Sequence, residues 1–159
     1  MSDEQQVKEK GFVEEVGLFF EQSGLPRMAG RILGWLLLSD PPHQSLDGLA
    51  EALMASKGSI STVTRLLIQI GLIERISLPG VRHYYYCIRP GALTRLLRQK
   101  TEAIKAFRQL AERGLELVRD KAPQARQRLA EVRDMYAFFE REFPILVERW
   151  EQEREKRRA

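Results

Sequence analysis

The sequence predicts a mainly α-helical fold with one short β-hairpin near the middle of the chain. Apolar residues recur at helical spacing through both ends of the chain, and two β-prone runs flank Pro79-Gly80. The 159 residues suffice for one compact domain with an extension, and an apolar content of 43% is enough for a core. We therefore expect a small domain that contains the hairpin and a further region made of helices.

Two helices are predicted in the N-terminal part of the chain. The first covers residues 5–22, where these apolar side chains share one face: Phe12, Val13, Val16, Phe19 and Phe20. Gly24 and Pro26 separate it from a second helix, because glycine suits a C-terminal cap and proline suits a first turn. The second helix is expected to end near Leu38, and residues 40–44 are expected to form a loop.

Gly30 and Gly34 lie four residues apart and so share one face of the second helix. Glycine in a helix interior costs about 1 kcal/mol relative to alanine. Two such positions on one face would let another backbone approach closely. The pair therefore predicts tight packing against a neighbouring element.

The central segment is predicted to hold two short helices and the hairpin. Ser45 and Asp47 are both suitable N-caps for the first of these helices, and the second covers about 59–70. An antiparallel hairpin follows, with its strands over 72–78 and 81–88.

From residue 91 onward two long helices are predicted, because good helix formers dominate the composition. The first covers 91–119 and is expected to turn these residues inward: Leu93, Leu96, Leu97, Ile104, Phe107, Leu110 and Val118. The second begins at Pro123 and carries a heptad series typical of a coiled-coil seam: Leu129, Val132, Tyr136, Phe139, Phe143, Leu146 and Trp150. Pro144 is expected to kink or restart this helix, and residues 151–159 are expected to fray.

Two short helices joined by a turn and followed by a hairpin form the winged helix-turn-helix pattern. In the second helix Ile60, Val63 and Leu67 lie in one apolar arc, and the opposite side is small, polar and cationic, without an acid. Such a face suits the major groove of duplex DNA. The predicted DNA contacts are Lys57, Ser59, Ser61, Thr62, Arg65 and Gln69 on the helix, with Arg75 and Arg82 on the hairpin.

These residue types differ in what they can read. Arg65 could bind guanine with two hydrogen bonds, whereas Lys57 and Ser59 lie at the helix N-terminus, which favours phosphate. Arg82 on the hairpin could reach a phosphate or an adjacent minor groove. Base preference is therefore expected from Arg65 and general affinity from the other cations.

The charge distribution agrees with a DNA-binding surface. The net charge is +4, and the segment between Lys57 and Arg89 has five basic residues against one acid, Glu74. The formal excess of that segment equals the net charge of the whole chain. A basic patch of this kind is typical of proteins that bind polyanions.

A single recognition helix makes few contacts, so we expect a homodimer that reads two half-sites about 10 base pairs apart. The predicted dimer interface consists of Phe12, Phe19, Leu129, Tyr136, Phe139, Phe143, Leu146 and Trp150. The alternative is a winged-helix module that binds another protein through its hairpin and seam, without sequence-specific DNA binding. Salt dependence separates the two, because DNA binding weakens steeply with salt.

Four blocks of sequence resemble the GbsR-like branch of the MarR superfamily of transcriptional regulators: GLPRMAGRILG at 24–34, SISTVTRLL at 59–67, GLIER at 71–75 and PGVR at 79–82. The resemblance implies a winged helix over 24–90 and an all-helical dimerisation region built from 1–23 and 91–159. It also implies a repressor that recognises an inverted-repeat operator. Gly80 departs from the superfamily, which often has an acidic residue two positions before the wing arginine.

A small-molecule effector is a further possibility that the resemblance raises. Aromatic residues on several of the predicted helices could line a cavity for it, with Phe20, Trp35 and Tyr136 as the candidates. Aromatic faces attract organic cations such as quaternary ammonium compounds. The same residues at helical spacing would serve equally well as core, and the sequence leaves both readings open.

Other chemistry is not predicted. The two histidines, His43 and His83, have no metal-ligand spacing, so we expect no metal, no cofactor and no enzymatic activity. Cys87, the single cysteine, is expected to be a buried, inert thiol. The longest apolar run is far shorter than the roughly 20 residues that cross a bilayer, so a cytoplasmic protein without a membrane partner is expected.

Overall fold

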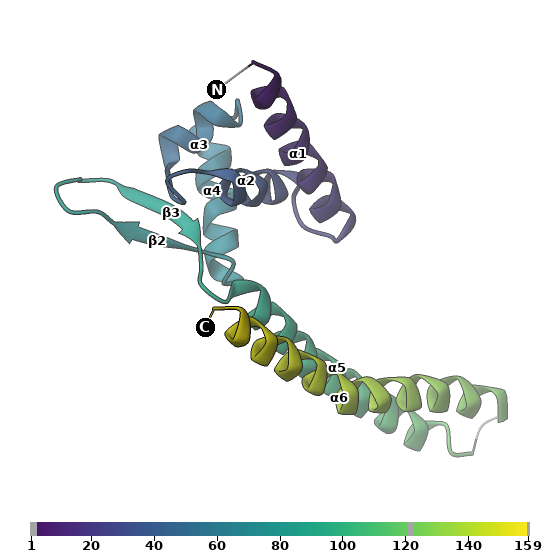
Figure 1. The fold of residues 1–159 in the computed structure, drawn as a ribbon. Helices are drawn as coiled ribbons and strands as arrows, with labels where there is room; N and C mark the ends of the chain where they lie inside the picture. The colour runs from purple at the N-terminus through teal and green to yellow at the C-terminus, as the bar shows by residue number, and fades with distance from the viewer. Residues whose placement is uncertain (1–2, 121–122, 159) are drawn as a thin grey trace. The chain divides into compact units, whose positions relative to one another are not determined.

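The computed structural model describes residues 3–120 and 123–158. The chain divides into two compact units, Met1–Ala92 and Leu93–Ala159 (Figure 1). Within residues 3–120 and 123–158, none of the helices has the length and apolar content that a membrane span requires.

The first unit contains the central segment and the N-terminal helices. Its elements in chain order are α1 (Asp3–Gln22), α2 (Arg27–Leu38), β1 (Gln44–Ser45), α3 (Leu46–Ala52), α4 (Lys57–Gln69), β2 (Ile73–Ser77) and β3 (Tyr84–Ile88). The predicted helices and the hairpin are all present, with ends that differ by a few residues. The fully buried side chains that form its core include Ile32, Leu49, Ile60, Leu67, Leu72 and Ile73.

Glycines bring α1 and α2 into close contact. A Cβ atom on Gly30 would lie 2.5 Å from the carbonyl oxygen of Val16, and one on Gly34 would lie 3.2 Å from the Cβ of Val16. Real Cβ atoms essentially never approach a heavy atom as closely as 2.5 Å. The prediction that this glycine pair marks close helix packing is therefore confirmed.

The sheet has three strands in the order β1-β3-β2, and β1 was not predicted. Gln44 pairs with Tyr86 and Ser45 pairs with Tyr85, so the expectation of a plain loop over 40–44 is wrong at Gln44. A strand of two residues is too short to show a periodic pattern. The hydroxyl of Ser45 also accepts a hydrogen bond from the amide of Gly48 at 3.0 Å, which makes Ser45 the N-cap of α3.

The second unit is an antiparallel hairpin of α5 (Ala92–Leu117) and α6 (Pro123–Arg158). Gly114 of α5 faces Leu129 of α6, and the rings of Phe107 and Tyr136 lie 4.7 Å apart. Near the other end, Arg98 is 2.5 Å from Glu151. Contacts between the two helices therefore extend along the hairpin.

Pro144 does not interrupt α6, which continues to Arg158. Of the two outcomes expected at Pro144, a kink or a restart, the restart is wrong, and so is the expected fraying beyond residue 151. Val147 is 5% exposed, and the ion pair of Glu151 with Arg98 attaches the C-terminal end to α5. Packing therefore outweighs the hydrogen bond that proline removes.

Several apolar side chains of α5 that were expected to point inward are exposed instead. Leu93 is 66% exposed, Leu110 is 51% exposed and Phe107 is 45% exposed. Helical periodicity identifies an apolar face, but it does not say whether the covering surface belongs to the same chain. The second unit therefore has a broad exposed apolar surface.

Candidate DNA-binding surface

The helix α4 begins where a serine caps it. The hydroxyl of Ser56 accepts a hydrogen bond from the amide of Ser59 at 3.1 Å, and the helix starts at Lys57, two residues before the predicted start. Lys57 therefore lies in the first turn, where free backbone amides and the helix dipole favour an anion.

One side of α4 packs in the core and the other side is open. Ile60 and Leu67 are fully buried and Val63 is 8% exposed, as the apolar arc predicts. On the other side Thr62 and Arg65 are exposed. Gln69 is also exposed, whereas Ser59 and Ser61 are half-buried. The predicted outward face is therefore present, with its two serines less open than expected.

Arg65 is oriented by its own helix. Its Nε donates a hydrogen bond to the carbonyl oxygen of Ser61 at 3.3 Å. The same carbonyl accepts a bond from the hydroxyl of Thr64 at 3.1 Å, which satisfies the polar group of a residue that is 1% exposed. Because this bond uses Nε, the two terminal nitrogens of Arg65 remain available to donate the paired hydrogen bonds that recognise guanine.

Lys57 has a partner that the sequence did not indicate. Its ammonium nitrogen lies 2.9 Å from a carboxylate oxygen of Asp47 in the first turn of α3, and both side chains are about two-thirds exposed. Exposed ion pairs contribute little to stability, about 0–1 kcal/mol. Lys57 can therefore exchange this carboxylate for a phosphate at small cost.

The hairpin β2–β3 supplies the wing. Its register pairs Arg75 with Tyr86 and Ser77 with Tyr84, and the loop 78–83 connects the strands. The second strand begins at Tyr84, not at residue 81 as predicted, because Gly80 at φ +78° and a bond from the Val81 amide to the Leu78 carbonyl form a turn. Arg82 is consequently exposed in the wing loop.

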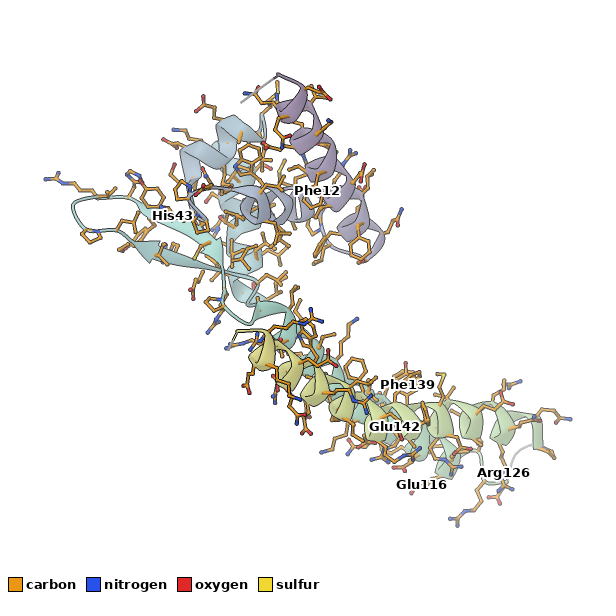
Figure 2. The ribbon with its side chains drawn as sticks, in the orientation of Figure 1. Phe12, His43, Glu116, Arg126, Phe139 and Glu142 are labelled. Carbon is orange, nitrogen blue, oxygen red and sulfur yellow. The ribbon has the colours of Figure 1, made fainter. Side chains whose placement is uncertain are left out.

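The three tyrosines of β3 have different surroundings. Tyr86 is 9% exposed and belongs to the core, whereas Tyr85 points the other way, as strand alternation predicts. Its ring lies 5.0 Å from the ring of His43, labelled in Figure 2, and 4.9 Å from that of His83. Tyr84 is 52% exposed and therefore lies outside the core.

Cys87 lies on β3 directly opposite Glu74 and is half-buried, so it is less enclosed than the sequence predicts. Burial, and secondly the negative charge of Glu74, raise the pKa of its thiol. A raised pKa lowers the fraction of reactive thiolate at neutral pH, which supports the prediction of an inert thiol. Among residues 3–120 and 123–158, no three His, Cys, Asp or Glu side chains are grouped as metal ligands would be.

The candidate effector residues are divided between the two units. Trp35 borders a hollow of about 480 Å³ in the first unit, between α1, α2 and α3. Phe20 lies on α1 of the same unit, with its ring 5.7 Å from that of Phe19. Tyr136 belongs to the second unit, where its ring contacts Phe107. Of the three predicted effector residues, Trp35 alone lines this hollow.

All of the predicted dimer residues are at least partly open in the single chain. Phe19 is 65% exposed, Leu146 is 57% exposed and Phe12 is 41% exposed. Phe139 and Trp150 are each 43% exposed, and Figure 2 labels Phe12 and Phe139. Leu129, Tyr136 and Phe143 are half-buried.

The helix pair α3–α4, the three-stranded sheet and the exposed cationic face of α4 define a winged-helix DNA-binding protein. MmpR5, an HTH-type transcriptional regulator of Mycobacterium tuberculosis (strain ATCC 25618 / H37Rv), is 46% identical over 129 residues, which cover 81% of this chain and 78% of that protein. The chain belongs to the MarR family of transcriptional regulators.

Two further comparisons agree. Residues 91–153 match the family described as MmpR5-like MarR family transcriptional regulators. A crystal structure of a transcriptional regulator is 43% identical, with a TM-score of 0.74 over 91% of this chain and 99% of that chain. The predicted fold class and DNA-binding regulatory function are confirmed, and the family is not a class of enzymes. The GbsR-like branch is not confirmed, since these relatives are MmpR5-like.

Proposed function

We propose that the protein is a homodimeric repressor that binds an inverted-repeat operator through α4 and the wing. The observation that carries this proposal is the outer face of α4, where Thr62, Arg65 and Gln69 are exposed and the helix Lys57–Gln69 contains no acid. Such a face can enter a major groove about 12 Å wide without like-charge repulsion from phosphates. A repressor would act by covering promoter DNA.

Exposed apolar residues support the homodimer. The second unit carries large, exposed apolar side chains along both of its helices. These include Leu93, Phe107, Leu110, Met135, Phe138, Phe139, Ile145, Leu146 and Trp150. Extended apolar surfaces on a folded chain typically mark an interface. We therefore assign dimerisation to 91–159 together with residues 1–23, and DNA reading to 24–90.

Selection of bound sequences from random duplexes tests the proposal. An inverted repeat with half-sites about 10 base pairs apart is expected, because a two-fold dimer presents α4 twice. The variant Arg65→Ala should weaken operator binding by about 1–3 kcal/mol and relax the preference at one base pair, whereas Lys57→Ala should weaken binding to every sequence alike. Equal losses on all sequences for both variants would reject Arg65 as a base reader.

An effector site at Trp35 completes the proposal. The hollow of about 480 Å³ beside Trp35 also has Glu9, Lys10 and Glu51 in its lining, so carboxylates lie near an aromatic ring. This combination suits an organic cation. Titration with benzyltrimethylammonium should quench the fluorescence of Trp35 in a Trp150→Phe protein. Quenching that Glu9→Gln and Glu51→Gln leave unchanged would reject the site.

The cellular location follows from the same proposal. A protein that covers promoter DNA must reside with the chromosome, so we assign it to the cytoplasm. The GbsR-like blocks at 24–34 and 79–82 lie in the part of the chain outside the 91–153 match, and the branch assignment stays a prediction.

A further inference from the structure

Arg75 of β2 and Tyr84 of β3 contact each other diagonally across the wing. The register pairs Arg75 with Tyr86 and Ser77 with Tyr84, so Arg75 and Tyr84 lie on the same face, two pairs apart along the ladder. The guanidinium carbon of Arg75 lies 4.5 Å from the centroid of the Tyr84 ring. This distance is within the roughly 6 Å over which a ring face attracts a cation.

The shared face is the one that packs on the helices. Ile73, on the same face two residues before Arg75, is 1% exposed, and Tyr86 on that face is 9% exposed. The strand β2 contacts α4, and the hairpin extends beyond the helices beside it (Figure 1). Arg75 and Tyr84 therefore stand where this face leaves the core, on the side of the wing that faces α4.

A ring and a carboxylate affect an arginine differently. A carboxylate neutralises the charge that it holds, as Asp47 does for Lys57. The acid of the wing, Glu74, pairs with Cys87 and lies on the opposite face of the hairpin from Arg75. The Tyr84 ring restrains the guanidinium and leaves its positive charge available to an anion.

We infer that Tyr84 is a positioning residue for DNA binding, whose ring holds the Arg75 guanidinium ready for a phosphate of the bound duplex. An arginine that is already restrained loses less side-chain entropy when it binds. The inference rests on the proposed function, in which Arg75 is a DNA contact. Neither the family comparisons nor the sequence pattern assigns a role to Tyr84.

A double-mutant cycle on the selected operator tests this role. Tyr84→Leu should weaken binding about two- to five-fold, as expected for an exposed cation–π contact, and should cause no further loss in an Arg75→Ala protein. Arg75→Ala should lower the salt slope by about one, whereas Tyr84→Leu should leave the slope unchanged. Tyr84→Phe keeps the ring and should bind like the parent protein. Tyr84→Thr also removes the ring and is favourable in a strand, so it replaces the leucine variant if that variant does not fold, with the same loss of affinity expected.

Three results would overturn the inference. The first is an equal loss from Tyr84→Leu in both backgrounds, and the second is a loss from Tyr84→Phe as large as that from Tyr84→Leu, which would point to a hydroxyl contact. The third is unchanged affinity in Arg75→Ala while Arg65→Ala weakens binding, in which case the proposed reading by α4 survives without the wing contact. Failure of the parent protein to select any duplex would instead reject the proposed function.

Discussion

Lys57 and Asp47 form an ion pair of 2.9 Å that joins the first turns of α4 and α3. The pair places a negative charge beside the predicted phosphate contact. Asp47→Asn should therefore strengthen DNA binding about two- to five-fold on specific and random duplexes alike, with the larger gain at low salt, where surface charges are less screened. Fluorescence anisotropy in about 50 and 200 mM salt measures this.

The matched control for this prediction is Glu51→Gln, which also removes one exposed acid from α3. It should change affinity much less than Asp47→Asn, because no ion pair with α4 is lost. Weaker DNA binding in Asp47→Asn would show that the carboxylate holds Lys57 in a productive position and does not compete with phosphate.

The close contact of α1 and α2 gives a prediction about stability. Gly30→Ala places a Cβ 2.5 Å from the Val16 carbonyl oxygen, so the helices must separate, at a cost of about 1–3 kcal/mol. Gly11→Ala is the control, since nothing lies within 4 Å of its added Cβ. That change should stabilise α1 by about 0.5–1 kcal/mol. Urea unfolding of both variants measures the change in the free energy of unfolding, which should be negative for Gly30→Ala and positive for Gly11→Ala. Equal changes in the two variants would contradict the close packing of α1 and α2.

The structural features that depend on a local sequence pattern could be predicted from the sequence. The helices and the outer face of α4 follow from apolar spacing, and the close helix contact follows from Gly30 and Gly34. These features need no knowledge of distant neighbours.

The features that could not be predicted depend on contacts between elements. The partner of Lys57 is ten residues away on another helix, and the contact of Arg75 with Tyr84 requires the hairpin register. Pro144 is tolerated because α6 packs on α5, which local propensity does not report. The alternation rule, combined with the register, could have placed Tyr84 beside Arg75.

Cys87 should react slowly with thiol reagents. Because its pKa is raised by burial and by Glu74, the thiolate should appear at higher pH than in a free cysteine, and the reaction rate should rise later as the pH increases. Glu74→Gln removes the smaller of the two causes and should move the midpoint of the rate profile part of the way back. A midpoint below that of free cysteine would contradict the inert role.

The exposed apolar surface of α6 gives a prediction about assembly. Phe139→Glu or Leu146→Glu introduces a charge at a position where the native side chain is 43% or 57% exposed in the single chain. Each variant should therefore leave the α5–α6 hairpin folded. If these side chains are covered in a dimer, an unpaired charge there costs several kcal/mol and should shift the protein toward a monomer. Light scattering with circular dichroism separates dissociation from unfolding.

Met54→Glu is the control for assembly, because Met54 is 87% exposed but lies in the turn between α3 and α4. It should leave the molar mass of the dimer unchanged. Operator binding should fall together with dimerisation in Phe139→Glu, since a monomer presents one α4 and the joint reading of two half-sites is lost. A monomeric variant that still binds the operator with full affinity would show that the two halves are read independently, and the dimer would then have no part in recognition.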